Sequence, residues 1–247
     1  MIEMGQLSED SAVEIQSEDW MRPAVLDKFS LFHGLSSQDR TAVGALLRRQ
    51  QFNAGAIIMS AEQVGEAVYL ILEGTVKIHI SREDGPNVVI AILGPGDIVG
   101  EMSLIDDTRR CASVLALESS TLLSMDRNVF RRCLRTMPIL SYNLACILTA
   151  RLRIADAHIE ALATCDVESR VARQLVAFTK RYGRATANGG LLIPIRITQS
   201  DIASMVGASR ETVNKIIVSY KERKFISVDS DQRITINNQQ ALTKRCQ

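Results

Sequence analysis

The sequence predicts an α+β protein of two domains, in which an antiparallel β domain is followed by a long helix and a smaller helical domain. The chain has 247 residues, more than a single domain usually contains. Short apolar runs separated by glycine-containing turns occupy residues 30–130, and helical periodicity takes over after Met137 and Pro138. Hydrophobic residues make up 46% of the chain and charged residues 23%, a balance typical of folded domains.

Residues 1–27 are rich in Asp and Glu and lack a sustained apolar period, so we expect a mobile or loosely docked N-terminal extension. No basic segment followed by an apolar one is present, and a secretory signal is therefore not expected. The longest apolar runs, Ala67 to Leu72 and Val88 to Leu93, have the length of strands rather than of a membrane span. We expect a cytoplasmic protein with no membrane partner.

The β domain is expected over residues 28–136. Turn signals punctuate it at Asn53 to Gly55, Glu73 to Gly74, Asp84 to Pro86 and Gly94 to Asp97. Evenly spaced turns between short apolar runs favour an antiparallel sandwich or barrel. In Val76 to Ile80 the apolar residues alternate with Lys77 and His79, so His79 is expected on the exposed, polar face of its strand.

The cysteines and histidines of the chain give little indication of a catalytic or metal-binding site. The five cysteines are scattered without a C-x-x-C pair, which favours reduced thiols over disulfides in a cytoplasmic chain. The three histidines are far apart and show neither metal-ligand nor triad spacing. We therefore expect a protein that is not an enzyme and holds no metal.

A long helix is expected over residues 137–164. An apolar seam with alternating spacings of three and four residues runs along it: Ala145, Leu148, Leu152, Ala155, Ile159 and Leu162. A narrow seam sustained over nearly three heptads favours a two-helix coil between two copies of the chain, so we expect a homodimer. A further helix begins after Asp166 as its N-cap and ends at Gly183, which makes residues 163–166 a candidate hinge.

Charge divides the chain unevenly. Residues 166–247 contain 14 Lys and Arg against 7 Asp and Glu, a net charge of +7, whereas residues 1–165 carry −6. A basic C-terminal domain suits a polyanion such as double-stranded DNA, because neutralised phosphates supply most non-specific affinity. On charge alone, a basic surface that faces solvent and binds no partner remains the alternative.

The C-terminal domain, residues 165–247, contains the pattern of a helix-turn-helix. Thr198 to Asp201 forms a capping box, Ala203 is small where two helices touch, and Gly207 permits the tight turn. Ser209 caps the second helix, whose exposed face near the N-terminus carries Arg210, Glu211, Asn214 and Lys215. Two strands around residues 229–231 then predict a wing. The candidate DNA-binding residues are Thr198, Gln199, Ser209, Arg210, Glu211, Asn214 and Lys215.

The segment from Gly94 to Ala112 combines backbone-permissive glycines with Glu101 and Arg110. Glycine turns let main-chain N–H groups approach a phosphate, an arginine neutralises it, and a carboxylate accepts from a sugar hydroxyl. The combination suits a small phosphorylated sugar. A lone Gly-Glu pair is weak evidence by itself, and a plain glycine turn remains the alternative.

Together, Gly100 to Leu104, Arg110 to Ala112, the seam helix and Ser209 to Val213 resemble the cyclic-AMP receptor branch of the Crp/Fnr transcription regulators. The resemblance covers roughly residues 28–236. It implies a jelly-roll-like, cyclic-nucleotide-binding β-roll, a dimerisation helix and a winged helix-turn-helix, with RNA polymerase as a further partner. It also implies that Glu101 binds the ribose 2′-hydroxyl, that Arg110 binds the cyclic phosphate, and that Arg210, Glu211 and Lys215 read a palindromic half-site. The implied nucleotide-binding residues are Gly100, Glu101, Met102, Arg110, Cys111, Ala112 and Asp156.

The effector has more than one candidate. The family's phosphate-contacting serine falls on Cys111, and its purine-contacting Thr-Ser pair falls on Ala155 and Asp156. Asp156 can accept from the adenine amine or from the paired N–H donors of guanine, so both cAMP and cGMP are expected ligands. A surface carboxylate that only flanks the seam is the alternative for Asp156. The alternative is a regulator of the same family that acts without a nucleotide, or senses haem or a cyclic dinucleotide. An iron–sulfur sensor is disfavoured because no cysteine precedes Cys111.

Overall fold

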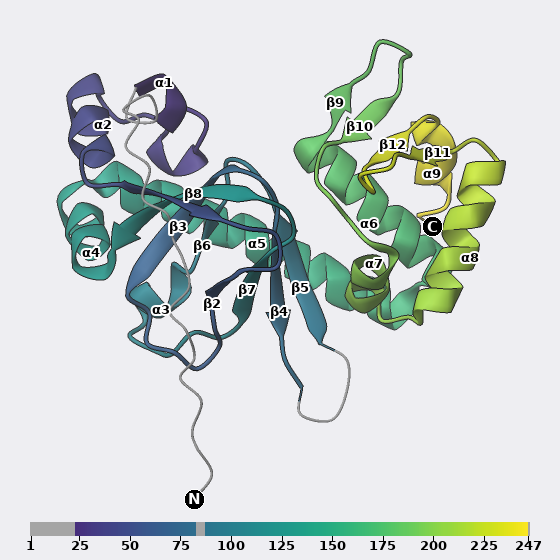
Figure 1. Cartoon of the computed structure of the whole chain (residues 1–247), viewed down its shortest axis with the longest axis horizontal. Coiled ribbons are helices and arrows are strands. Elements are labelled where there is room, and N and C mark those ends of the chain that lie inside the picture. Colours follow the sequence, from purple (N-terminus) through teal and green to yellow (C-terminus); the bar gives the residue numbers. More distant parts are fainter. Residues whose placement is uncertain (1–22, 83–86, 247) are drawn as a thin grey trace, which may run out of the picture.

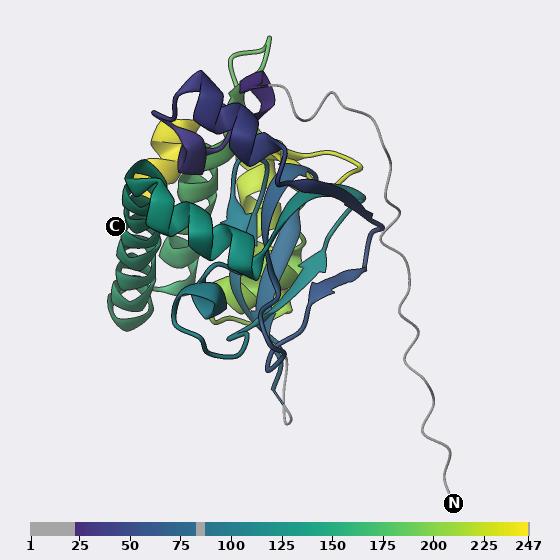
Figure 2. The same cartoon turned by 90° about the vertical axis from the view of Figure 1, so that its left-hand side faces the viewer.

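The computed structural model describes residues 23–82 and 87–246. Its N-terminal domain begins with short helices, and two more helices flank the last strands of the domain (Figure 1). These helices are α1 (Pro23–Leu26), η2 (Ser30–Phe32), α2 (Ser37–Gly44), α3 (Met102–Ile105) and α4 (Arg127–Thr136). Figure 2 shows α1 and α2, in purple, at one end of the strands, with α4 and the long helix α5 along one side of them.

Among the described residues of the β domain, eight strands form two antiparallel four-stranded sheets, as expected for a sandwich or barrel. The strands are β1 (Arg48–Phe52), β2 (Ile57–Met59), β3 (Ala67–Glu73), β4 (Val76–Ile80), β5 (Val88–Leu93), β6 (Ile98–Val99), β7 (Ser113–Ala116) and β8 (Ser120–Asp126). One sheet has the order β1-β8-β3-β6 and the other the order β2-β7-β4-β5. Apolar side chains from both sheets, including Ile71, Val76 and Leu122, form the core between them. The predicted turn at residues 84–86 lies largely outside the described residues.

The packed part of the chain starts earlier than residue 28. Residues 1–22 of the predicted extension lie outside the described residues, but Pro23–Leu26 forms α1. Leu26 is completely buried, in a core that also contains Phe29 and Phe32. Asp27 forms an ion pair with Arg40 of α2. Residues 23–27 therefore belong to the folded β domain, because the apolar contacts of Leu26 hold them in place. The acidic composition of residues 1–27 as a whole gave no sign of these contacts.

The expectation that His79 is exposed is wrong. Only 8% of its surface is exposed. The register of β4 against β5 shifts between Ile78 and His79, which indicates a β-bulge. One extra residue reverses the face that the following side chains occupy, so His79 is buried while Ile80 is 41% exposed. Period-2 alternation cannot reveal such a shift, because a bulge depends on how the partner strand pairs.

The long helix α5 (Pro138–Thr164) begins with a proline in its first turn and leads from the β domain to the C-terminal domain (Figure 1). Much of its predicted seam is open to solvent within one chain: Leu152 is 62% exposed, Ile159 is 66% exposed and Leu162 is 50% exposed. Three large apolar side chains on one face of a helix form an unpartnered stripe.

The C-terminal domain contains four helices and a small antiparallel sheet of order β11-β12-β10-β9. Its elements are α6 (Val167–Tyr182), β9 (Arg184–Ala185), β10 (Leu191–Ile193), α7 (Gln199–Val206), α8 (Arg210–Glu222), β11 (Ile226–Val228), β12 (Ile234–Ile236) and α9 (Gln239–Lys244). Asp166 caps α6 by accepting from the Ser169 amide, and α6 ends before Gly183, both as expected. The hairpin β11–β12 is the predicted wing, and β9 and β10 extend its sheet.

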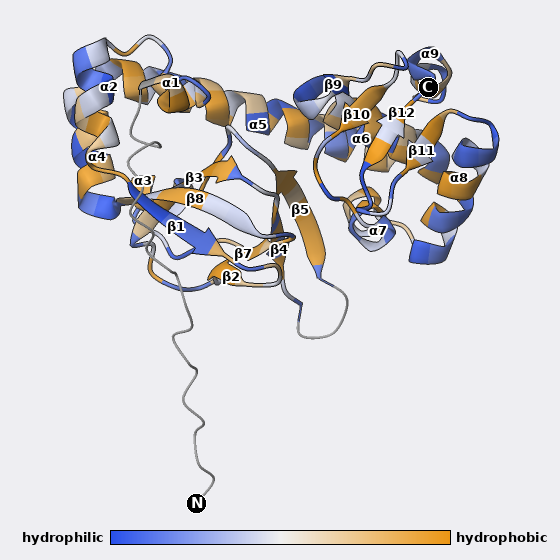
Figure 3. Ribbon diagram, turned by 45° about the horizontal axis from the view of Figure 1, so that its top comes forward, coloured by the Kyte–Doolittle hydropathy of each residue, from blue (hydrophilic) through white to orange (hydrophobic). Residues whose placement is uncertain are grey.

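Strand β5 contributes to the cores of both domains. Val89 and Ile92, both almost completely buried, pack with Ile193, Ile202 and other apolar residues of the C-terminal domain. Figure 3 shows β5 as a strongly hydrophobic strand on the side of the β domain that faces α7. The two domains are therefore joined by a shared apolar interface as well as by α5.

Candidate functional site

The Gly-Glu segment lies where β6 ends and α3 begins. Gly100 has a φ of +85°, and a Cβ atom there would lie 2.7 Å from the Arg110 Nη1 and 2.9 Å from the Met59 Cε. Glycine is therefore required both for the backbone conformation and for the space that Arg110 occupies. Glu101 follows directly and is 2% exposed, while Arg110 is 5% exposed. The structure thus brings the two predicted charged residues into the same buried region.

Arg110 is held by oxygen atoms of the surrounding loops. Its Nη1 donates to the Gly100 carbonyl and, at 2.9 Å, to the Ser103 hydroxyl, and its Nη2 donates to the Ala67 carbonyl at 2.5 Å. Burial lowers the pKa of Arg110, and the nearby Tyr69 and Glu101 oppose that shift. The guanidinium is therefore a buried cation held by neutral oxygens, an arrangement that suits an anionic ligand.

Glu101 has a charged partner that the sequence analysis did not predict as a site residue. The Nη1 of Arg151, on α5, lies 2.6 Å from the Glu101 Oε1. The Nη2 of Arg151 also donates to the Ile98 carbonyl in β6. The only sequence signal for this role was the position of Arg151 beside the apolar seam, where charged residues are common for other reasons. This ion pair ties the long helix to the Gly-Glu segment.

The remaining predicted nucleotide residues lie in different environments. Ala112 is buried and Cys111 is exposed, directly after Arg110, while Met102 is 51% exposed on α3. Asp156 is exposed on α5, five residues after Arg151 and hence about 140° around the helix from it. Arg151 and Asp156 leave the helix on different sides, so within one chain Asp156 does not join Glu101 and Arg110.

The helix-turn-helix has the predicted local structure. The Thr198 hydroxyl accepts from the Asp201 amide while Asp201 accepts from the Thr198 amide, so the capping box at the start of α7 is confirmed. Gly207 has a φ of +62° and ends α7 in the left-handed conformation. Ser209 caps α8 by accepting from the Thr212 amide, as expected. The side chains of Thr198 and Ser209 therefore serve as caps.

The polar side chains at the start of α8 point to solvent. Arg210, Glu211, Asn214 and Lys215 are all exposed, whereas Val213 and Ile217 pack into the domain core. Gln199, in the first turn of α7, is half-buried. The structure therefore brings Arg210, Glu211, Asn214 and Lys215 together on one accessible helix face of the size that enters a DNA major groove.

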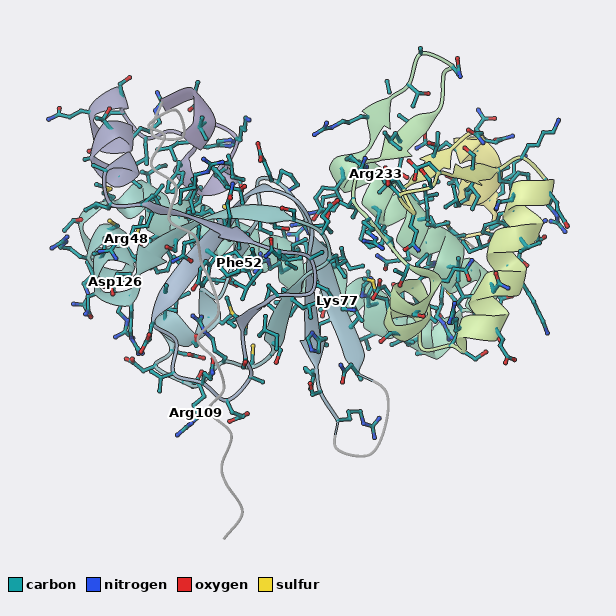
Figure 4. The ribbon with its side chains drawn as sticks, viewed as in Figure 1. Arg48, Phe52, Lys77, Arg109, Asp126 and Arg233 are labelled. Carbon is teal, nitrogen blue, oxygen red and sulfur yellow. The ribbon has the colours of Figure 1, made fainter. Side chains whose placement is uncertain are left out.

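Polar contacts bridge the two domains beside the shared apolar interface. Lys77 of β4 lies between the domains (Figure 4), with its Nζ 3.0 Å from the Asp201 Oδ1 in α7. The Ser204 hydroxyl accepts from the Val89 amide at 2.8 Å. In the turn before β6, Asp97 accepts from the Tyr182 hydroxyl at 2.5 Å and pairs with Arg181. The helix-turn-helix is thus bound directly to the β domain.

Residues 23–82 and 87–246 contain neither a metal-binding cluster nor a single membrane-spanning helix. No group of three or more His, Cys, Asp or Glu in that part of the chain is arranged to hold a metal ion. No single helix there is long and apolar enough to cross a membrane; only α4 and α5 taken together, across a bend of 108°, have sufficient apolar length. All five cysteines are free thiols.

A β domain with a buried cation and carboxylate, joined by one long helix to a winged helix-turn-helix, is typical of ligand-responsive DNA-binding regulators. Residues 49–137 match the model of the cyclic nucleotide-binding domain, and residues 169–245 match that of the Crp-like helix-turn-helix domain. The chain belongs to the Crp/Fnr family of transcription regulators.

Curated relatives agree with this assignment, and a solved structure has the same fold. The CRP-like cAMP-activated global transcriptional regulator of Mycobacterium tuberculosis is 32% identical over 222 residues, covering 90% of this chain and 98% of the relative. The cyclic AMP receptor protein of Thermus thermophilus is 32% identical over 196 residues, covering 79% and 87%. FixK2 from Bradyrhizobium japonicum has the same fold, with a TM-score of 0.72 at 19% identity over 80% of this chain and 96% of FixK2.

Proposed function

We propose that the protein is a non-enzymatic transcription regulator of the cytoplasm that binds cAMP or cGMP at Glu101 and Arg110. As a homodimer it recognises palindromic double-stranded DNA through α8. The observation that carries the proposal is a buried cation and a buried carboxylate placed together beside a glycine of positive φ. These groups complement a cyclic phosphate and a ribose hydroxyl respectively. The cAMP-activated relatives support the same class of effector.

Ligand binding at this site acts on α5 through Arg151. A ribose 2′-hydroxyl that donates to Glu101 adds a second donor to the carboxylate that already accepts from the Arg151 Nη1, and this weakens the ion pair. Weakening that ion pair changes how α5 is held against the β domain. The Glu101–Arg151 ion pair therefore differs in strength between the free and the ligand-bound protein. Ligand-driven allostery requires such a difference between the two states.

The purine contact is proposed to come from a second subunit. Asp156 leaves α5 away from the Glu101 of its own chain and directly follows Ala155 of the apolar seam. Pairing two seams places Asp156 beside the β domain of the partner copy. A carboxylate there accepts from the adenine amine or from two guanine donors, so it does not by itself discriminate cAMP from cGMP. Cys111 supplies a weaker donor to the phosphate than a serine does.

Dimerisation is supported by the exposed stripe that Leu152, Ile159 and Leu162 form on α5. Two copies related by a two-fold axis present their α8 helices to half-sites about one helical turn apart, which makes the DNA site palindromic. RNA polymerase is the further partner that family membership suggests.

One observation favours the alternative of regulation without a nucleotide. In this structure Arg110 already has three oxygen partners, and Glu101 already has an arginine partner. A site whose buried charges are satisfied by protein groups is stable without a ligand. The test below therefore includes ligands of more than one class.

The proposal is tested by isothermal titration of the full chain with cAMP, cGMP and cyclic di-GMP. Arg110→Leu removes the charge-assisted contacts to the phosphate, so affinity for the mononucleotide should fall ten- to a hundredfold, or about 1.5–3 kcal/mol. The matched control is Arg109→Leu, because Arg109 is exposed and projects from the lower edge of the β domain (Figure 4). Equal mononucleotide affinity in wild type and Arg110→Leu, or binding of cyclic di-GMP alone, contradicts the proposal.

A further inference from the structure

A cleft between the two domains lies apart from the Gly-Glu segment. A cavity of about 590 Å³ opens between β5, α5 and α6, and a second of about 410 Å³ continues along α5 and α6 towards α9. The residues shared by both linings are Ile154, His158, Gln174, Ala177, Lys180 and Met205. We call the two together the interdomain cleft. The volume of each cavity falls within the range of roughly 300–1,000 Å³ that is typical of small-molecule sites.

The walls of the interdomain cleft combine apolar surface with an excess of positive charge. Ile90, Ile92 and Phe178 are among the apolar residues of the larger cavity. The cations that line the cleft are Arg151, Arg170, Arg173, Lys180 and Arg181, besides His158. Asp97 is the one carboxylate among the lining residues, and Arg181 and Tyr182 already engage it. The field within the cleft therefore favours an anion.

Two polar side chains in the shared lining have capacity to bind a ligand. Gln174 is 6% exposed and lines both cavities. Lys180 lies six residues, or about one and two-thirds helical turns, further along α6. It is exposed and has no carboxylate within ion-pair distance among residues 23–82 and 87–246. The amide and the ammonium groups both carry N–H donors, so an anionic group in the cleft can accept from them.

We propose that the interdomain cleft is a second effector site, which binds an organic monoanion with an apolar body, such as a medium-chain carboxylate. The anionic head accepts from the Lys180 ammonium and the Gln174 amide. The apolar body lies against Ile90, Phe178 and Met205. The site adjoins the proposed nucleotide site at Arg151 but uses different ligand-binding residues, and its existence does not depend on which cyclic nucleotide binds at Glu101 and Arg110.

An occupant of the interdomain cleft contacts both domains at once. β5 and α5 supply one wall, whereas Gln174 and Lys180 of α6 and Met205 of α7 supply the other. Binding therefore stabilises one orientation of the helix-turn-helix relative to the β domain. Arg151 lines the larger cavity and also pairs with Glu101, so the two sites share a residue and their occupancies are coupled.

The experiment uses the full chain and the fluorescence of bound 8-anilinonaphthalene-1-sulfonate, displaced by decanoate. Ala177→Trp fills the cleft from an exposed position on α6, and Ala187→Trp places the same side chain in the exposed turn between β9 and β10. Lys180→Glu reverses the charge at the head group, with Lys28→Glu as its control. Wild type and both controls should show one saturable decanoate site per chain. Ala177→Trp and Lys180→Glu should each weaken displacement about tenfold or more.

Three results would overturn the proposal. Displacement that never saturates in wild type shows adsorption to exposed apolar surface. Unchanged decanoate affinity in Lys180→Glu, together with weakened non-specific DNA binding, identifies Lys180 as a phosphate contact instead. Cyclic-nucleotide titration of the same samples separates the two sites: wild type that binds nucleotide but not decanoate refutes only the cleft, and the converse refutes only the nucleotide site.

Discussion

The Lys77 ammonium lies 3.0 Å from the Asp201 carboxylate, although the two residues are separated by 124 positions in the chain. Asp201 uses its other oxygen in the capping box that begins α7. One carboxylate therefore both initiates the first helix of the helix-turn-helix and binds that helix to β4. The side chain of Asp201 is only 5% exposed, so solvent screens the pair less than a surface ion pair.

Lys77→Met should loosen this contact between the domains. The substitution removes the ammonium but keeps an apolar side chain of similar length. We expect faster hydrogen exchange in residues 87–93, because the Val89 amide donates to Ser204 of α7. Exchange in β8 should not change. Lys28→Met, at an exposed lysine of the β domain, is the control, and equal exchange in the two variants would show that the ion pair does not hold the interface.

His79 should make stability depend on mildly acidic pH. Burial lowers its pKa from the ordinary value of 6.5, and the neighbouring Lys77 lowers it further. The unfolded chain then binds more protons than the folded chain, so stability is complete above pH 6.5 and falls as the pH drops below it. Thermal unfolding at pH 7.5 and pH 5.5 should show a loss of a few degrees in wild type.

The same shift in melting temperature should be smaller in His79→Gln. Carboxyl groups with a lowered pKa, such as those of Asp107 and Asp166, start from an ordinary value of 3.8 and lose their contribution only in more acidic solution. The interval from pH 7.5 to pH 5.5 therefore avoids the titration of these carboxyl groups, and the comparison with His79→Gln separates His79 from His33 and His158. An identical shift in wild type and variant would place the titrating group elsewhere.

Leu152→Glu should dissociate the dimer. Leu152 is 62% exposed in one chain and lies in the middle of the seam, where two glutamates would face each other across the two-fold axis. Sedimentation should shift to the monomer, and affinity for a palindromic site should fall about a hundredfold or more because only one half-site is held. Leu152→Met keeps the seam apolar and should remain dimeric. A dimeric Leu152→Glu would refute the seam as the interface.

Arg210→Ala and Lys221→Ala should weaken DNA binding in different ways. Arg210 is exposed in the first turn of α8, where a side chain reaches base edges, so its loss should cost about 1–3 kcal/mol and relax specificity at one base pair. Lys221 lies in the last turn of the same helix and should contact phosphate. Its loss should weaken binding to all sequences and lower the salt dependence by about one counterion. Competition binding with single-base operator variants distinguishes the two effects.

The local structure of this protein was largely determined by short sequence patterns. The capping box at Thr198 and Asp201, the left-handed Gly207 and the N-cap at Asp166 all formed as predicted. Each depends on backbone and side-chain groups within four residues of one another, so nearby sequence contains the information. The 3,4 spacing of the α5 seam likewise predicted one helix face, since helical period relates residues along the chain.

Only the tertiary structure decided which distant groups meet. Arg151 reaches Glu101, Lys77 reaches Asp201, and a bulge in β4 buries His79. No periodicity marks these residues, because each outcome depends on strand register and on the position of α5 and α7 against the β domain. The sequence alone determined which charged side chains the candidate site contains. The tertiary structure determined their partners, because ion pairs and burial depend on distance in space rather than on separation along the chain.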